Sequence, residues 1–168
     1  MQQLSAARYR GRFAPSPTGP LHFGSLVAAL GSFADARAHR GSWLVRMDDL
    51  DSPREVRGAA DQILRTLDTF GFEWDGSILY QSTRHDAYAE ALARLDEADR
   101  TYPCACSRRE IAQSGQAGPE GPIYAGTCRH GIVTGRMARS TRIRTDTPPI
   151  VFEDRIQGRM EQNLRRDV

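Results

Sequence analysis

Arg12-Phe-Ala-Pro-Ser-Pro-Thr-Gly-Pro-Leu-His-Phe-Gly-Ser25 connects a predicted strand to a predicted helix. Its prolines stiffen the backbone, and its glycines let a ligand approach the backbone closely. The helix is expected to begin near Gly24-Ser25, so its free N–H groups and the positive end of its dipole can receive a phosphate. His22 precedes this helix and can donate to a phosphate oxygen. The alternative is a rigid turn in which Ser25 only caps the helix. Since a turn alone needs neither this length nor so many polar donors, the stretch favours a nucleotide site.

The segments on both sides of this connection predict a β-α-β unit with parallel strands and a right-handed crossover. Residues 8–14 form the first predicted strand, and Trp43-Leu-Val-Arg-Met47 is apolar enough for a second strand buried on both faces. Asp48-Asp49-Leu50-Asp51 follows that second strand. Its carboxylates should therefore meet the Arg12–Ser25 loop at the carboxyl edge of the sheet. The helix between the strands carries apolar residues at helical spacing: Leu26, Val27, Leu30, Phe33, Ala34 and Ala38.

Periodicity predicts further elements downstream. A helix over 55–70 follows Pro53 and has an apolar stripe of Val56, Ile63, Leu64, Leu67 and Phe70. A helix over 84–96 is expected to bury Tyr88, Leu92 and Leu95. Residues 115–135 are rich in Gly and Pro and predict a loop or a metal-organised insert, and 141–144 and 150–152 are predicted strands.

Composition sets the broad class of protein. The 168 residues, 39% of them hydrophobic and 26% charged, suffice for one domain with a core, and no run is long and apolar enough for a membrane span. A cytoplasmic protein without a membrane partner is expected. The net charge of +2 does not by itself argue for nucleic acid. Nine Arg against five acidic residues in 129–168 can face phosphates or form a solvated surface.

The three cysteines, Cys104, Cys106 and Cys128, form a second signal. Their odd number argues against disulfides. Zinc requires a fourth ligand, for which Tyr124 and His130 are the main candidates, and chemistry alone favours the imidazole. The alternative is three unconnected thiols. A bound metal would supply folding energy to an insert that has little apolar material.

Arg12-Phe-Ala-Pro-Ser-Pro-Thr-Gly19 followed by Leu21-His-Phe-Gly24 resembles the signature of class I glutamyl-tRNA synthetases and their relatives. Ser25 stands where the family's His-Ile-Gly-His element has its second His, which removes one phosphate donor. With Arg84-His-Asp-Ala-Tyr88 and Cys104-Ala-Cys106, the resemblance points to the branch that attaches glutamate to queuosine in tRNA(Asp), and it covers about residues 9–158.

The resemblance implies an α/β fold: a Rossmann-like parallel sheet with helices on both faces, a small zinc-binding insert, and a second half of the nucleotide fold that is missing here. The implied domains are 8–100 for the first half of the catalytic domain, 101–135 for the insert and 136–168 for the start of its continuation. The branch places a Tyr four residues before the last Cys. The implied structural Zn²⁺ ligands are therefore Cys104, Cys106, Tyr124 and Cys128.

The resemblance also implies the site residues. The L-glutamate site comprises Arg12, Phe13, Ala14, Pro15, Ser16 and Asp48. The site for ATP with Mg²⁺ comprises Pro15, Thr18, Gly19, His22, Gly24 and Ser25, with His22 and Ser25 as the catalytic pair. The family has Glu where Asp48 stands, so this carboxylate is one methylene short. The alternative for the acids after the second strand is that they solvate a loop and cap the next helix.

The implied reaction joins glutamate to ATP as glutamyl-adenylate and transfers the glutamyl group to queuosine in the anticodon of tRNA(Asp). All 23 basic residues are Arg, so the family's second ATP motif, Lys-Met-Ser-Lys-Ser, is absent. We therefore expect an amino-terminal part of a longer enzyme, a monomer with weak or no activation alone. The alternatives are a fragment of a conventional glutamyl-tRNA synthetase and a non-catalytic zinc-containing module that binds tRNA.

Overall fold

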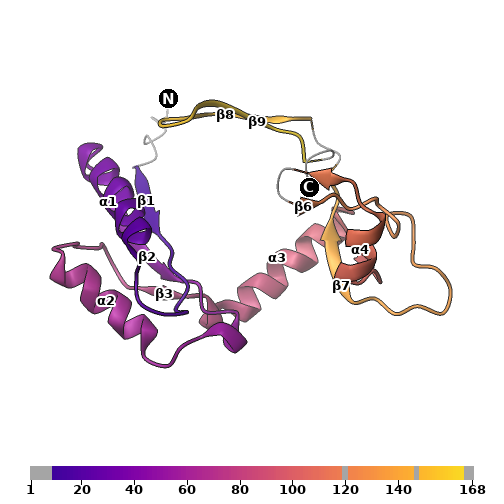
Figure 1. The fold of residues 1–168 in the computed structure, drawn as a ribbon, viewed down its shortest axis with the longest axis horizontal. Helices are drawn as coiled ribbons and strands as arrows, with labels where there is room; N and C mark the ends of the chain where they lie inside the picture. The colour runs from indigo at the N-terminus through magenta and orange to yellow at the C-terminus, as the bar shows by residue number, and fades with distance from the viewer. Residues whose placement is uncertain (1–8, 119–120, 146–147, 165–168) are drawn as a thin grey trace, which may run out of the picture. The chain divides into compact units, whose positions relative to one another are not determined.

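A computed structural model describes residues 9–118, 121–145 and 148–164. The chain divides into two compact units, Met1–Tyr88 and Ala89–Val168 (Figure 1). The first unit contains β1 (Arg10–Phe13), α1 (Phe23–Ala38), β2 (Ser42–Met47), the 3-10 turn η1 (Ser52–Arg54), α2 (Ala59–Thr69), β3 (Leu79–Tyr80) and the 3-10 turn η2 (Gln81–Arg84). Helix α3 (His85–Glu97) crosses the division between the units. The domain boundaries expected near residues 100 and 135 stay a prediction.

The first unit is built on a parallel sheet in the order β1-β2-β3. Gly11 of β1 pairs with Trp43, and Met47 of β2 pairs with Tyr80. The predicted β-α-β unit with parallel strands is thus confirmed. Helix α1 packs so closely on β1 that a Cβ atom at Gly11 would lie 3.0 Å from both the Ala36 Cβ and the Ser32 carbonyl oxygen. A glycine is therefore required at this crossing.

Only one face of β2 is buried among the described residues. Trp43, Val45 and Met47 are at most 2% exposed, whereas Leu44 and Arg46 between them are half-buried. The expectation of burial on both faces is wrong here, because α1 and α2 contribute to one core on one side of the sheet. That core consists of Phe13, Ala29, Ala36, Trp43, Val45, Met47, Ile63, Leu67 and Phe72.

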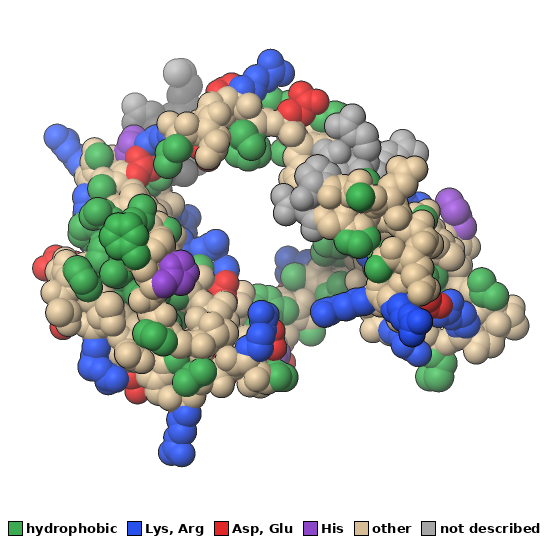
Figure 2. Space-filling view, in the orientation of Figure 1, with side chains coloured by type: hydrophobic (Ala, Val, Ile, Leu, Met, Phe, Trp, Pro, Cys, Tyr) green, Lys and Arg blue, Asp and Glu red, His purple; other side chains and the backbone are tan. Residues whose placement is uncertain are grey.

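The fully buried side chains of helix α1 are small ones that the predicted stripe does not include. Ala29 and Ala36 are fully buried, while Val27 and Leu30 are 52% and 58% exposed. Figure 2 shows hydrophobic side chains gathered on the surface over this helix. The predicted stripe therefore divides in two: Leu26 and Phe33 pack against the core, whereas Val27 and Leu30 lie on the outer face.

Helices α2 and α3 also differ in part from their predictions. Residues Ser52–Arg54 form η1, and α2 begins only at Ala59, four residues later than predicted. Two residues of its predicted apolar stripe, Val56 and Phe70, are exposed. Ile63 and Leu67 are fully buried, as expected. The predicted burial of Tyr88, Leu92 and Leu95 is wrong: these α3 side chains are 39%, 45% and 37% exposed. Neither core cluster contains a residue of α3.

The second unit consists of short elements. They are β4 (Thr101–Cys104), α4 (Arg108–Ser114), β5 (Ala117–Gly118), β6 (Gly121–Pro122), β7 (Ser140–Ile143), β8 (Ile150–Asp154) and β9 (Gly158–Gln162). Strands β4 and β7 pair antiparallel, and β8 and β9 form a hairpin, which confirms the two predicted strands after residue 140. Among the helices of the described residues, none combines the length and apolar character that crossing a bilayer requires.

The different burial of two leucines gives a test of this core. Replacement of the fully buried Leu67 by Ala is expected to lower the unfolding free energy by about 2–5 kcal/mol, since it leaves a cavity. Leu30→Ala, on the outer face of α1, should change it by less than about 0.5 kcal/mol. Trp43 and Trp74 are the two tryptophans and both lie in the first unit, so tryptophan fluorescence during urea unfolding measures both variants. Equal losses would contradict the assignment of the buried face.

Candidate active site and cysteine cluster

The loop between β1 and α1 is fixed to the segment that follows β2. The Asp48 N–H donates to the Pro15 carbonyl oxygen at 2.9 Å, and the Val56 N–H donates to the Pro17 carbonyl oxygen at 2.9 Å. Pro15 and Pro17 are both buried. The proline-rich loop and the acidic segment thus meet at the carboxyl edge of the sheet, as parallel strands predict.

A cavity of about 580 Å³ opens along this loop. Its lining brings together most of the residues predicted for glutamate and ATP, namely Phe13, Ala14, Pro15, Ser16, Thr18, Gly19, His22, Gly24 and Ser25. Pro20, Leu21 and Ala28, which were not predicted, complete it. Arg12 and Asp48 do not line it. Arg12 lies between the buried Gly11 and Phe13, so strand alternation places its side chain on the opposite face of the sheet.

His22, not Ser25, is the N-cap of α1. Its Nδ1 accepts the Ser25 N–H at 3.2 Å, so the alternative in which Ser25 caps the helix is wrong. When Nδ1 accepts, the neutral ring carries its proton on Nε2 and can donate it to a ligand. The first turn of α1 has no acidic residue, which leaves the positive end of the helix dipole uncompensated. This helix end therefore suits an anion.

Asp48 is held by a residue that the sequence reasoning did not single out. Arg46 Nε lies 2.5 Å from Asp48 Oδ1 and Arg46 Nη2 lies 2.9 Å from Oδ2, a two-pronged ion pair. The hydrogen bond with Asp48 raises the pKa of Arg46. Residues two apart in a strand share a face, so the Arg-x-Asp spacing was the available signal for this pair.

The neighbouring acids also have defined partners. Asp49 accepts hydrogen bonds from the Ser82 N–H at 2.9 Å and from the Ser82 hydroxyl at 2.5 Å. Burial raises the pKa of Asp49, but the hydrogen bonds from Ser82 outweigh this and leave it below its ordinary value. Asp51 pairs with Arg54 and makes no side-chain cap to η1. Ser82, which ties β2 to the start of η2, is a second residue that the sequence reasoning missed.

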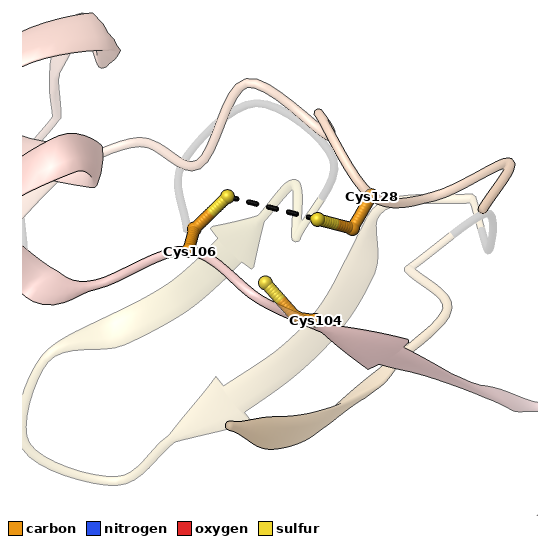
Figure 3. A group of neighbouring side chains, drawn as sticks. All are labelled: Cys104, Cys106 and Cys128. Carbon is orange, nitrogen blue, oxygen red and sulfur yellow. Dashed lines mark hydrogen bonds between the residues drawn. The ribbon is translucent and has the colours of Figure 1, made fainter. Parts of the chain in front are cut away.

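The three cysteines converge in the second unit (Figure 3). Their sulfur atoms all lie within 4.8 Å of one another, and Cys106 Sγ lies 3.7 Å from Cys128 Sγ. Bonds of about 2.3 Å at tetrahedral angles place thiolate sulfurs about 3.8 Å apart around zinc. The cluster therefore has the size of a metal site, and the alternative of three unconnected thiols is wrong.

Tyr124 completes this group. Its hydroxyl oxygen lies 3.4 Å from Cys104 Sγ and 3.8 Å from Cys106 Sγ, and it accepts the Cys128 N–H at 2.8 Å. His130 is exposed and, among the described residues, does not join the sulfur cluster. Of the two candidates for a fourth ligand, the geometry favours Tyr124.

The surroundings of the cluster are polar and charged. Burial raises the pKa of the Cys104 thiol, but the Tyr124 hydroxyl and the Arg142 guanidinium beside it reverse this shift and bring it to about 6. Burial, followed by the contact with Cys104, raises the pKa of Tyr124. Helix α4 begins next to Cys106 with a capping box, in which Glu110 accepts from the Ser107 N–H at 2.7 Å.

Comparison with known proteins gives a family match and close relatives. The family model for the catalytic domain of class I tRNA synthetases (E and Q) matches residues 8–166. The glutamyl-Q tRNA(Asp) synthetase of Dechloromonas aromatica is 64% identical over 162 residues, which are 95% of this chain and 54% of that protein. The protein of the same name from Chromobacterium violaceum is 55% identical over 98% of this chain and 55% of its own length. The chain spans about half the length of these relatives.

Among solved structures, a glutamate tRNA ligase from Elizabethkingia meningosepticum matches with a TM-score of 0.73 at 23% identity. The match covers 94% of this chain and 36% of that one. At this identity the likeness establishes the fold alone, and it confirms the predicted α/β class with a parallel sheet and helices.

The capping role of His22 can be separated from ligand binding. His22→Ala removes the acceptor for the Ser25 N–H and should lower the unfolding free energy by about 0.5–2 kcal/mol. His22→Asn keeps an acceptor of a preferred capping type and should stay close to the original stability. Urea unfolding followed by tryptophan fluorescence measures both variants. An equal stability of the Ala variant and the unsubstituted chain would show that the cap contributes nothing.

Proposed function

Since the chain belongs to the family of class I tRNA synthetases for glutamate and glutamine, we propose that it forms the ATP- and glutamate-binding part of an enzyme that glutamylates queuosine in tRNA(Asp). The observation that carries this proposal is the junction between the two loops at the sheet edge, where the Asp48 N–H meets the Pro15 carbonyl oxygen. The names of the relatives supply the tRNA and queuosine part of the proposal.

ATP is proposed to bind along the cavity with its phosphates at the start of α1. The backbone N–H of Gly24 and the Nε2 proton of His22 are the donors that this helix end offers, since the Ser25 N–H is already bonded to His22. Thr18 and Gly19 line the same cavity. Mg²⁺ bound with ATP would neutralise phosphate charge.

Glutamate is proposed to bind across the same sheet edge. Arg12 offers a two-pronged partner for its side-chain carboxylate, and Asp48 offers an acceptor for its α-ammonium group. The α-carboxylate attacks the α-phosphorus of ATP, a new O–P bond forms, and the bond to pyrophosphate breaks. The protein supplies no nucleophile; its contribution is positioning and charge stabilisation.

The cysteine cluster is proposed to hold a structural zinc ion through Cys104, Cys106, Tyr124 and Cys128. The buried cluster of this unit is small and consists of Tyr102, Cys104, Ala105 and Cys128. Zinc would therefore stabilise the unit by cross-linking its segments. A cytoplasmic monomer is the state we propose for the chain.

A conventional glutamyl-tRNA synthetase is the second candidate function. Ser25 in place of the second His, together with Tyr124 four residues before Cys128, favours the queuosine branch. A non-catalytic zinc-containing module that binds tRNA is the third candidate.

Transfer of labelled glutamate separates the three candidates. The purified chain and a full-length relative are assayed with ATP on tRNA(Asp) with and without queuosine, and on glutamate tRNA. We expect the relative to label tRNA(Asp) only when queuosine is present. We also expect the chain to bind ATP, and the His22→Asn substitution to weaken this binding. Labelling of the 3′ end of glutamate tRNA would support the conventional synthetase, and no ATP binding by the chain would support the non-catalytic module.

Metal content tests the proposed zinc site. One zinc per chain is expected by elemental analysis after purification without added metal. Cys106→Ser and Tyr124→Phe should each lower the affinity measured against a chelator, because each removes a ligand. His130→Ala is the matched control and should leave the affinity unchanged. Zinc loss in the His130 variant with retention in the Tyr124 variant would reverse the choice of fourth ligand.

A further inference from the structure

Arg142 of β7 lies against the proposed metal ligands without being one of them. The central carbon of its guanidinium lies 3.8 Å from the centroid of the Tyr124 ring. Strand pairing explains this position: Arg142 pairs with Tyr102 of β4, and Cys104 follows two residues after Tyr102 on the same face of that strand. Its side chain therefore reaches both Tyr124 and Cys104.

The state of the Arg142 side chain distinguishes it from ordinary surface arginines. Its Nε is buried and has no hydrogen-bond partner among the described residues. A buried donor without a partner destabilises a fold by about 1–3 kcal/mol, so a compensating interaction is required. A guanidinium over an aromatic face supplies part of it, and a nearby anionic cluster supplies more.

A nearby cation would offset the charge that the cluster carries with a metal bound. Three thiolates around a divalent ion leave one excess negative charge, and an ionised tyrosine would leave two. Cys104 is fully buried and Cys128 is 4% exposed, so water screens this charge poorly. A fixed positive charge beside the sulfurs therefore stabilises the metal-bound state more than the metal-free state.

We propose that Arg142 is a positioning residue for the metal site: its guanidinium orients the Tyr124 ring toward the three sulfurs and compensates the excess negative charge of the cluster. The inference rests on the proposed zinc site. It gives a role to a residue outside the ligand set, and it explains how an oxygen from Tyr124 can serve where a fourth sulfur or nitrogen is usual. Outer partners that orient ligands commonly change metal affinity when they are replaced.

The test measures Zn²⁺ affinity of the full chain by competition with a chromogenic chelator. Arg142→Met should weaken binding about 10- to 100-fold, the range typical of lost outer partners. Arg142→Lys should weaken it less, since it keeps the charge but loses the planar group that stacks on the ring. Arg139→Met is the matched control: it removes the same charge from an exposed side chain three residues away and should leave the affinity unchanged.

A second measurement separates positioning from a general loss of stability. The chain is saturated with Co²⁺, whose visible absorption reports the number and geometry of its ligands. With Arg142→Met the saturated spectrum should shift toward that of Tyr124→Phe, because the ring is no longer held. An affinity equal to that of the unsubstituted chain, or a lower affinity with an unshifted spectrum, would overturn the role of Arg142. Failure of the unsubstituted chain to bind zinc would instead overturn the metal site itself.

Discussion

The indole of Trp43 is the contact on which the first unit depends. It is fully buried in the middle strand of the sheet, stacks with Phe72 at 5.6 Å and meets the edge of Phe33 at 5.2 Å between ring centroids. Its Nε1 donates to the Ser32 hydroxyl of α1 at 2.9 Å. Because this one ring contacts both α1 and the segment after α2, it joins them to the sheet. The loop that carries the candidate site begins where β1 ends, and the acidic segment begins where β2 ends.

The sequence predicted the elements well where polar residues and strand order carry the signal. The β-α-β unit, the meeting of the two loops and the sulfur cluster all follow from motif residues whose spacing is visible in the chain. Packing was predicted less well. Helix α1 uses Ala29 and Ala36 against the sheet, and hydrophobicity ranks such small residues below Val27 and Leu30, although close approach at Gly11 requires them.

Pairs that depend on side-chain direction were also missed. The capping role of His22 requires its ring to turn back over Ser25, and composition does not encode that rotation. The exposure of α3 has a different origin. Its apolar spacing is regular, but neither core cluster of the described residues reaches it, and periodicity reports only which residues share a face, not what covers them.

The shorter carboxylate at Asp48 gains a meaning from its partner. A glutamic acid residue in place of Asp48 would extend one methylene further from the strand. In this chain, Arg46 instead binds both oxygens of the shorter Asp48 side chain. An ion pair between Arg46 of β2 and Asp48, which directly follows this strand, holds the carboxylate near the backbone and restricts its rotation. Each oxygen retains a further lone pair for an ammonium group. Arg46 therefore holds the short acid as a fixed acceptor, and in the proposed glutamate site an α-ammonium group would approach close to the strand end, beside the loop that begins with Ala14.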